Sequence, residues 1–174
     1  PEAVGQLLPD PNQALAVHST LLVMRAPDAA VEIWEREALA QVKLRPAYRH
    51  LLTVSGIGTV LGLTIMLETG PVARFGAVGN YVSYCRCVGS ERLSNGKRKG
   101  RGNTKNGNKY LAWAYIEAAN FAVRYNAAIK RYYQRKREKT NGIVAIKTVA
   151  HKLARACYYM LRDGTDFEVG RAFA

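Results

Sequence analysis

The stretch that decides the fold is residues 47–68, which read AYRHLLTVSGIGTVLGLTIMLE. Pro46 can begin a helix at its first turn, where its missing N–H is not needed. Apolar residues recur at helical spacing through residues 47–54 and again through residues 60–68. Between them lies the glycine-containing turn Ser55-Gly56-Ile57-Gly58. The pattern predicts a helix-hairpin-helix whose turn amides can face a phosphate; the alternative is a tight turn between two helices.

The helical pattern continues on both sides of this stretch. Residues 11–26 and 28–45 predict two helices, with Asp28 as the N-cap of the second. Further helices are expected over residues 78–87, along one apolar stripe from Leu111 to Tyr132, and over residues 143–162. No segment has the period of a strand. We therefore expect a mostly α-helical protein, with a compact domain over residues 46–174 and a helical arm or linker over residues 1–45 whose helices could pair.

The charge of the chain favours a polyanionic partner. Its 174 residues hold 26 Lys and Arg against 13 Asp and Glu, a formal net charge of +13. Such an excess favours nucleic acid first and an anionic membrane surface second. No apolar run is long enough to span a membrane. Three cysteines and no secretory signal predict a reducing, cytoplasmic compartment. Because the chain begins with Pro1, we expect it to be part of a longer protein.

A second informative stretch is residues 94–109, SNGKRKGRGNTKNGNK, with four glycines and six Lys or Arg. It has no acidic or apolar anchor, so we expect residues 95–108 to form a loop that is mobile without its partner. Glycines and cations before a helix N-terminus are typical of a phosphate cradle, although a solvated basic loop is the alternative. The residues expected to bind DNA are Ser55, Gly56, Ile57 and Gly58 of the hairpin and Lys97, Arg98, Lys99, Arg101, Lys105, Asn108 and Lys109.

Two further features of the sequence are its three cysteines and the basic segment of residues 130–137. Cys85 and Cys87 are two apart and Cys157 is distant, so the spacing of a zinc site is absent and no metal site is expected in this chain. Residues 130–137 are basic with aromatics interleaved. This segment could follow a nucleic-acid backbone, with Tyr132 or Tyr133 stacking on a base.

Several strings resemble a known family in order and spacing. They are Leu52-Thr53-Val54-Ser55-Gly56-Ile57-Gly58, Arg74-Phe75, Tyr84-Cys85-Arg86-Cys87-Val88, Ser94-Asn95-Gly96-Lys97 and Lys105-Asn106-Gly107-Asn108-Lys109-Tyr110-Leu111. Together they resemble the C-terminal domain of the insertion sequence 110 family of transposases, and most closely its insertion sequence 1111 subgroup. The resemblance covers about residues 46–162.

The resemblance implies a DNA recombinase that cleaves and transfers strands through a phosphoserine intermediate. It places the nucleophile at Ser94, with Ser90 as the rival. It also implies an N-terminal RuvC-like domain that holds Mg²⁺ and is absent from this chain. The fragment alone should therefore be inactive and carry no cofactor. DNA, an element-encoded guide RNA and further copies of the chain are the expected partners, with no membrane, at the bacterial nucleoid.

Two other functions compete with this hypothesis. A non-catalytic DNA- or RNA-binding module would use the hairpin and the basic stretch alone. A tyrosine recombinase fragment is disfavoured, since no Arg–His–Arg–Tyr set has suitable spacing. Only the serine transposase predicts a covalent link between a serine and DNA.

Overall fold

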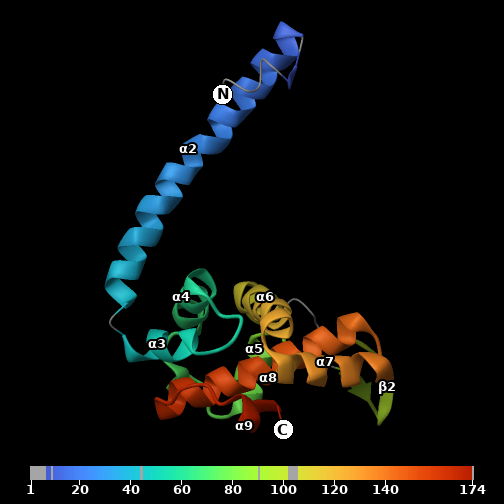
Figure 1. Ribbon diagram of the computed structural model, residues 1–174. Coiled ribbons are helices and arrows are strands. Elements are labelled where there is room, and N and C mark those ends of the chain that lie inside the picture. The colour runs from blue at the N-terminus through green and yellow to red at the C-terminus, as the bar shows by residue number, and fades with distance from the viewer. Residues whose placement is uncertain (1–6, 9, 44, 90, 102–105, 174) are drawn as a thin grey trace. The chain divides into compact units, whose positions relative to one another are not determined.

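The computed structural model describes residues 7–8, 10–43, 45–89, 91–101 and 106–173, with the backbone alone for strand residues 91–93 and 98–101. The chain divides into two units, Pro1–Lys43 and Leu44–Ala174. Both are mostly helical, which confirms the predicted fold class (Figure 1). In the described ranges, no helix is long and apolar enough to cross a membrane.

The main element of the first unit is helix α2, Pro11–Val42. Asp10 caps its start, because Asp10 Oδ1 accepts a hydrogen bond of 2.8 Å from the backbone nitrogen of Asn12. The prediction of two helices divided near Pro27 is wrong, since the helix continues through this residue. Proline fixes φ at a value that a helix accepts, but it removes one backbone donor and crowds the carbonyl four residues before it, and neither cost ends this helix. Loss of that single donor does not end a helix that has ordinary residues on both sides.

The second unit begins with α3, Pro46–Leu52, and α4, Thr59–Thr69, followed by the 3-10 turn η1, Val72–Arg74, and α5, Val78–Tyr84. A β-hairpin of β1, Glu91–Ser94, and β2, Lys97–Arg101, comes next. The chain ends with α6, Lys109–Tyr125, α7, Ala127–Lys139, α8, Gly142–Asp163, and α9, Val169–Phe173. Helix α8 contacts α3, α5, α6, α7 and α9, so it is the central helix of this unit (Figure 1).

The core lies between α6 and α8, and alanines let these helices approach closely. The buried residues of α6 are Leu111, Ala114, Tyr115, Ala118, Ala119 and Ala122. Those of α8 are Ala145, Val149, Ala150, Leu153, Ala154, Cys157, Tyr158 and Met160. Both sets repeat at helical spacing, so each helix buries one face. The apolar stripes predicted for these segments are thus the faces that form the core.

The stripe expected to run unbroken from Leu111 to Tyr132 belongs to two helices. Helix α6 ends and α7 begins at Asn126, whose backbone is extended (φ −119°, ψ 115°). Asn126 Oδ1 accepts hydrogen bonds from the backbone nitrogens of Ala128 and Ile129, at 3.0 and 3.2 Å. This N-cap compensates for the hydrogen bonds lost at the break, because it satisfies amides that lack partners at the start of α7.

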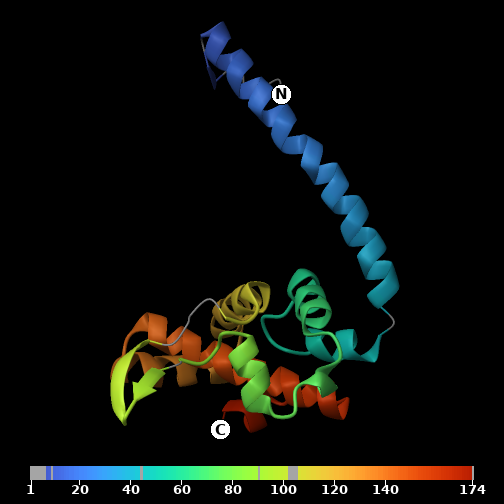
Figure 2. The same ribbon diagram turned by 180° about the vertical axis from the view of Figure 1, so that it is seen from behind.

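Residues 91–101 form an antiparallel β-hairpin where we had expected only a loop (Figure 2). Its two turn residues, Asn95 and Gly96, both have positive φ, 51° and 71°. Positive φ at both positions defines the tight hairpin turn for which Asn-Gly is the preferred pair. That dipeptide was present in the sequence, but its charged flanks lack the apolar alternation that usually accompanies it.

Buried hydroxyl and thiol groups lie together beside α8. Tyr81 Oη is hydrogen-bonded to Tyr115 Oη at 2.6 Å and to Thr69 Oγ1 at 3.0 Å, and all three side chains are fully buried. Burial raises the pKa of Tyr81 and Tyr115. It also raises the pKa of Cys157 to about 12. Cys157 is therefore protonated at neutral pH and packs as a small apolar side chain.

These raised pKa values predict that the protein loses stability as the pH rises above about 9. The folded state keeps the Cys157 proton, whereas the unfolded chain releases it above the ordinary thiol pKa of 9.0. Stability is thus fully present below pH 9 and is lost toward the folded pKa of about 12. Urea unfolding at pH 7.5, 8.5, 9.5 and 10.5 measures this decline.

The control is Cys157→Ala, which removes one of the titrating groups. Its stability should fall less steeply, by up to about 1.4 kcal/mol per pH unit. Identical pH profiles for the two proteins would contradict the assignment.

Candidate functional site

Ser94 lies at the end of β1, directly before the hairpin turn, and its side chain is exposed. Its cross-strand partner is Lys97, the first residue of β2, which is also exposed. Directly opposed residues in an antiparallel pair project from the same face of the hairpin. The fold therefore places an exposed serine and an exposed lysine side by side on the hairpin. A cation next to a hydroxyl can stabilise negative charge that develops at a phosphate.

The remaining residues of the basic stretch fall into two groups. Arg98, Lys99 and Arg101 lie on β2, where the register shifts opposite Arg92 and Leu93. Lys105 and the rival serine, Ser90, lie outside the described residues. The hairpin register thus defines the backbone positions of three predicted DNA-binding cations.

The end of the basic stretch is held in place by close backbone contacts. Gly107 has a φ of +91°, and a Cβ atom there would collide with the Tyr84 carbonyl oxygen and lie 3.1 Å from its carbon. The next amide, that of Asn108, donates to the same Tyr84 oxygen at 2.7 Å. Arg86 Nη2 donates to the Gly107 carbonyl at 2.9 Å. Only glycine fits at position 107, so this residue serves packing.

Asn108, which we predicted to bind DNA, uses its side chain within the fold. Its Oδ1 caps α6 by accepting from the amides of Tyr110 and Leu111, at 2.8 and 3.0 Å. Its Nδ2 donates to Glu68 Oε2 at 2.5 Å and to Tyr84 Oη at 3.4 Å. The oxygen and the nitrogen of this side-chain amide both have partners within the protein, which favours a role in positioning the start of α6. Lys109 is exposed beside it, with Nζ 4.9 Å from the Tyr110 ring centroid.

The Arg74-Phe75 pair joins the same cluster. Arg74 Cζ lies 4.6 Å from the Phe75 ring centroid and 4.8 Å from that of Tyr84. The hydrogen bond from Asn108 and the Arg74 guanidinium lower the pKa of the Tyr84 hydroxyl. Strings that are far apart in the sequence therefore meet at the N-terminus of α6. Sequence reasoning missed Glu68 in this cluster, because nothing in its local pattern indicates a partner forty residues away.

The turn between α3 and α4 packs against the C-terminal half of α6. Gly56 has a φ of +96°, and a Cβ atom there would collide with the Ala118 carbonyl and lie 2.6 Å from the Ala122 nitrogen. Ile57 is buried, with 4% of its surface exposed. Ser55 Oγ accepts a 3.1 Å hydrogen bond from Asn126 Nδ2. These three residues of the turn are thus directed at the protein.

Gly58 is the residue of this turn that is open to solvent. It is exposed, and nothing lies within 4 Å of a Cβ atom built on it. Gly58 is also the N-cap of α4 and supplies no side-chain cap, so the first amides of α4 remain available. Residues 56–61, with Phe121 and Tyr125 of α6, line a shallow pocket of about 470 Å³. Of the four turn residues predicted to bind DNA, Gly58 is therefore the one that a phosphate could approach, together with the first turn of α4.

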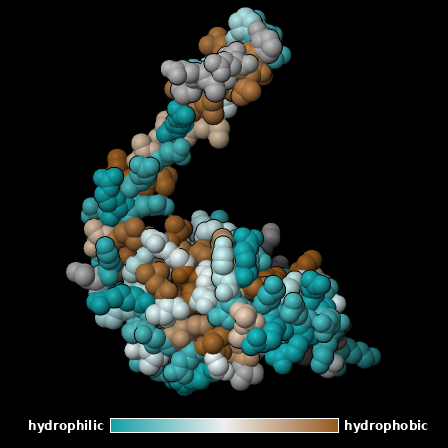
Figure 3. All heavy atoms as spheres, viewed as in Figure 1, coloured by the Kyte–Doolittle hydropathy of each residue, from teal (hydrophilic) through white to brown (hydrophobic). Residues whose placement is uncertain are grey.

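Tyr132, one of the two tyrosines predicted to stack on a base, is buried. Only 8% of its surface is exposed, and its ring packs edge-to-face on Phe173 with centroids 5.3 Å apart. The docking of α9 over α7 explains this burial, and no local pattern in the sequence indicates that the C-terminal residues return to this helix. The cations Lys130, Arg131, Arg135 and Arg137 of α7 are exposed. Figure 3 shows hydrophilic side chains over this part of the second unit.

Comparison with known proteins agrees with the resemblance in the sequence. The model of the Transposase IS116/IS110/IS902 family matches residues 48–134, half of the chain. This range runs from α3 to α7 and includes the α3–α4 turn, the hairpin and the cluster at Asn108. No curated protein matches the chain.

The two glycines of the α3–α4 turn should respond differently to the same substitution. Gly56→Ala should lower the free energy of unfolding by about 2 kcal/mol or more, because of its positive φ and its contact with the α6 backbone. Gly58→Ala should change the free energy of unfolding by less than about 1 kcal/mol, since no atom lies near the position that the new Cβ would take. Urea unfolding of both variants measures this; equal losses would show that the turn does not pack as described.

Proposed function

Because the chain belongs to the IS116/IS110/IS902 family of transposases, we propose that its second unit binds DNA and carries the serine nucleophile of a recombinase. The observation that carries this proposal is the position of Ser94. It is an exposed hydroxyl at the tip of a defined hairpin, across from Lys97 and in a strongly basic segment.

The proposed step is attack by Ser94 Oγ on the phosphorus of a DNA phosphodiester. A bond forms between Oγ and phosphorus, and one of the bridging P–O bonds of the backbone breaks. The proton of the serine passes to a base, and the released deoxyribose oxygen takes up a proton. Attack by a second DNA hydroxyl reverses these changes and transfers the strand, so no net oxidation occurs.

Lys97 is proposed to stabilise the charge that develops on the phosphate oxygens during both steps. Arg98, Lys99, Arg101, Lys105 and Lys109 add a positive field around it. Ser90 remains the rival nucleophile, four residues earlier. The base is proposed to belong to another domain of the full-length protein.

The described residues do not fit a metal site, since none of their His, Cys, Asp and Glu side chains gather in a group of three or more that could hold an ion. Mg²⁺ is proposed to bind in a separate RuvC-like domain, as the resemblance implies. A guide RNA encoded by the element is a further proposed partner.

The decisive experiment substitutes Ser94→Ala in the full-length protein with guide RNA, donor DNA and target DNA. The variant should lose nearly all covalent protein–DNA adduct and strand transfer, because the nucleophile is gone. Its DNA affinity should stay within about threefold of wild type, because cations supply the binding.

Two variants complete the test. Ser83→Ala removes an exposed hydroxyl from α5 and should retain activity. Ser90→Ala should also retain activity. If this variant is inactive and still binds DNA, the nucleophile is Ser90. An active Ser94→Ala protein that forms adduct would refute the assignment, and absence of any serine adduct would favour a non-catalytic binding module.

We further propose that α2 pairs with α2 of a second copy. Its large apolar side chains are mostly exposed, with Trp34 at 71%, Val23 at 72% and Leu22 at 56%. Val17, Met24, Val31 and Ala38 follow one another at intervals of seven residues, and Trp34 follows Val31 by three, which suits the a and d positions of a paired helix. Within α2 itself only Val42 is buried.

The pairing proposal predicts that Val31→Lys with Trp34→Lys shifts the chain from dimer toward monomer in analytical ultracentrifugation. Charges in an apolar seam oppose association. Asn12→Lys with Ser19→Lys, which adds the same charge at exposed polar positions on the opposite face of the helix, should leave the dimer intact. A wild-type chain that sediments as a monomer at all concentrations would exclude the proposal.

A further inference from the structure

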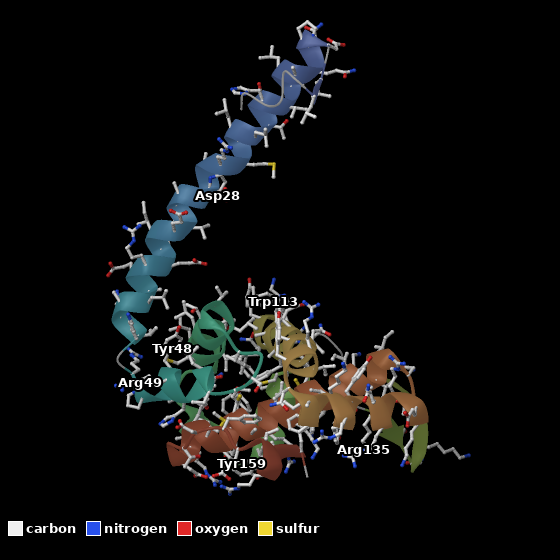
Figure 4. The ribbon with its side chains drawn as sticks, in the orientation of Figure 1. Asp28, Tyr48, Arg49, Trp113, Arg135 and Tyr159 are labelled. Atoms are coloured by element: carbon white, nitrogen blue, oxygen red, sulfur yellow. The ribbon has the colours of Figure 1, made fainter. Side chains whose placement is uncertain are left out.

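Three cations from two helices gather around one buried ring. Arg135 Cζ lies 6.0 Å, Lys136 Nζ 5.8 Å and Lys152 Nζ 5.1 Å from the centroid of Tyr132. Lys152 Nζ is also 5.7 Å from the Phe173 centroid. Figure 4 places Arg135 at the edge of the second unit, on the side where α9 packs against α7.

The position of this cluster is fixed by its surroundings. Tyr132 and Phe173 are 8% and 6% exposed and pack edge-to-face. Lys152 Nζ donates a 2.8 Å hydrogen bond to the Ala172 carbonyl, which ties α8 to α9. The ring faces attract the cations. The side chains are thus held by packing as well as by charge.

A fourth cation extends the cluster toward solvent. Arg155 is exposed and follows Lys152 by three residues on α8, so the two side chains share a face of that helix. Burial and the neighbouring cations Arg155, Lys136 and Arg135 lower the pKa of Lys152. Four like charges therefore lie close enough to repel one another.

No ion pair in the described ranges joins a carboxylate to this cluster. The ion pairs found there are His50–Asp166 and Arg162–Asp163, and neither involves the cluster. An assembly of like charges without counter-charge is destabilising in the free protein. It becomes favourable when an anion binds, because the same field then attracts.

We infer that Arg135, Lys136, Lys152 and Arg155 form a backbone-phosphate site for duplex DNA, separate from the hairpin of Ser94 and from the α3–α4 turn. The inference rests on the proposed DNA-binding function. Arg135 and Arg155 are exposed and can reach a phosphate directly, whereas Lys152, half-buried, supplies fixed charge behind them. Such contacts position a duplex and read no sequence.

The test uses the full-length protein with Arg135→Gln, Lys136→Gln and Arg155→Gln combined; Lys152 is kept because it bonds to α9. The matched control combines Arg25→Gln, Arg36→Gln and Lys147→Gln, all exposed, so both proteins lose three charges. The measurement is affinity for a duplex of unrelated sequence at several salt concentrations.

The site variant should lower the log–log salt slope by about 2 to 3, since each phosphate contact contributes about 0.9. The control should lower it by less than about 1. Equal changes in the two proteins would overturn the inference, as would loss of guide-RNA binding without loss of duplex binding. Arg135→Gln alone, with an expected change of about 0.9, keeps the test valid if the triple variant folds poorly.

A second readout separates a binding site from a structural role. In the absence of DNA, the site variant should be at least as resistant to urea as wild type, because repulsion is relieved. Marked destabilisation of single Arg135→Gln would overturn the inference. Failure of the Ser94 proposal is distinguished by adduct formation, which this experiment does not involve.

Discussion

Close backbone contact at two glycines holds the second unit together around α6. Gly107 brings the end of the basic stretch against the Tyr84 carbonyl at one end of this helix. Gly56 brings the α3–α4 turn against the backbone of Ala118 and Ala122 toward the other end. Both glycines have a positive φ and no room for a side chain, so each contact depends on the residue type.

Asparagine caps reinforce both contacts. Asn108 starts α6 and also reaches Glu68 of α4, and Asn126 starts α7 and also reaches Ser55 of the turn. Each side chain thus satisfies helix amides and binds a second element at the same time. The residues proposed to act on DNA, Ser94 and the exposed cations, lie outside this framework. These residues are not needed to hold the fold together, because the glycines and asparagines of the framework do so.

Much of the helical architecture was readable from the sequence, because α6 and α8 bury faces whose apolar residues repeat at helical spacing. The break at Asn126 was not, since only the cap itself interrupts an apolar pattern that suits one helix. The Asn95-Gly96 dipeptide is typical of a hairpin turn, but the charged residues beside it lack the apolar alternation that indicates strands. The course of α2 through Pro27 shows that one missing donor does not decide a helix boundary.

The site was less predictable, because it depends on contacts between distant segments. The position of Ser94 across from Lys97 follows from the hairpin register. The burial of Tyr132 and the cluster around it follow from the return of α9 to α7, which no local pattern encodes. Asn108 was recognised as part of a motif, but its bond to Glu68 assigns it to the framework. The DNA-binding and catalytic roles of the exposed residues remain predictions.

Hydrogen exchange at the Asn108 amide tests the framework most directly. This amide donates to the Tyr84 carbonyl at 2.7 Å, next to Gly107. If that contact anchors α6, the Asn108 amide should exchange about as slowly as the amide of Ala114 in the buried middle of the helix, since both would open only with the whole unit. Exchange of Asn108 at the rate of an unprotected amide, while Ala114 stays protected, would contradict this anchoring.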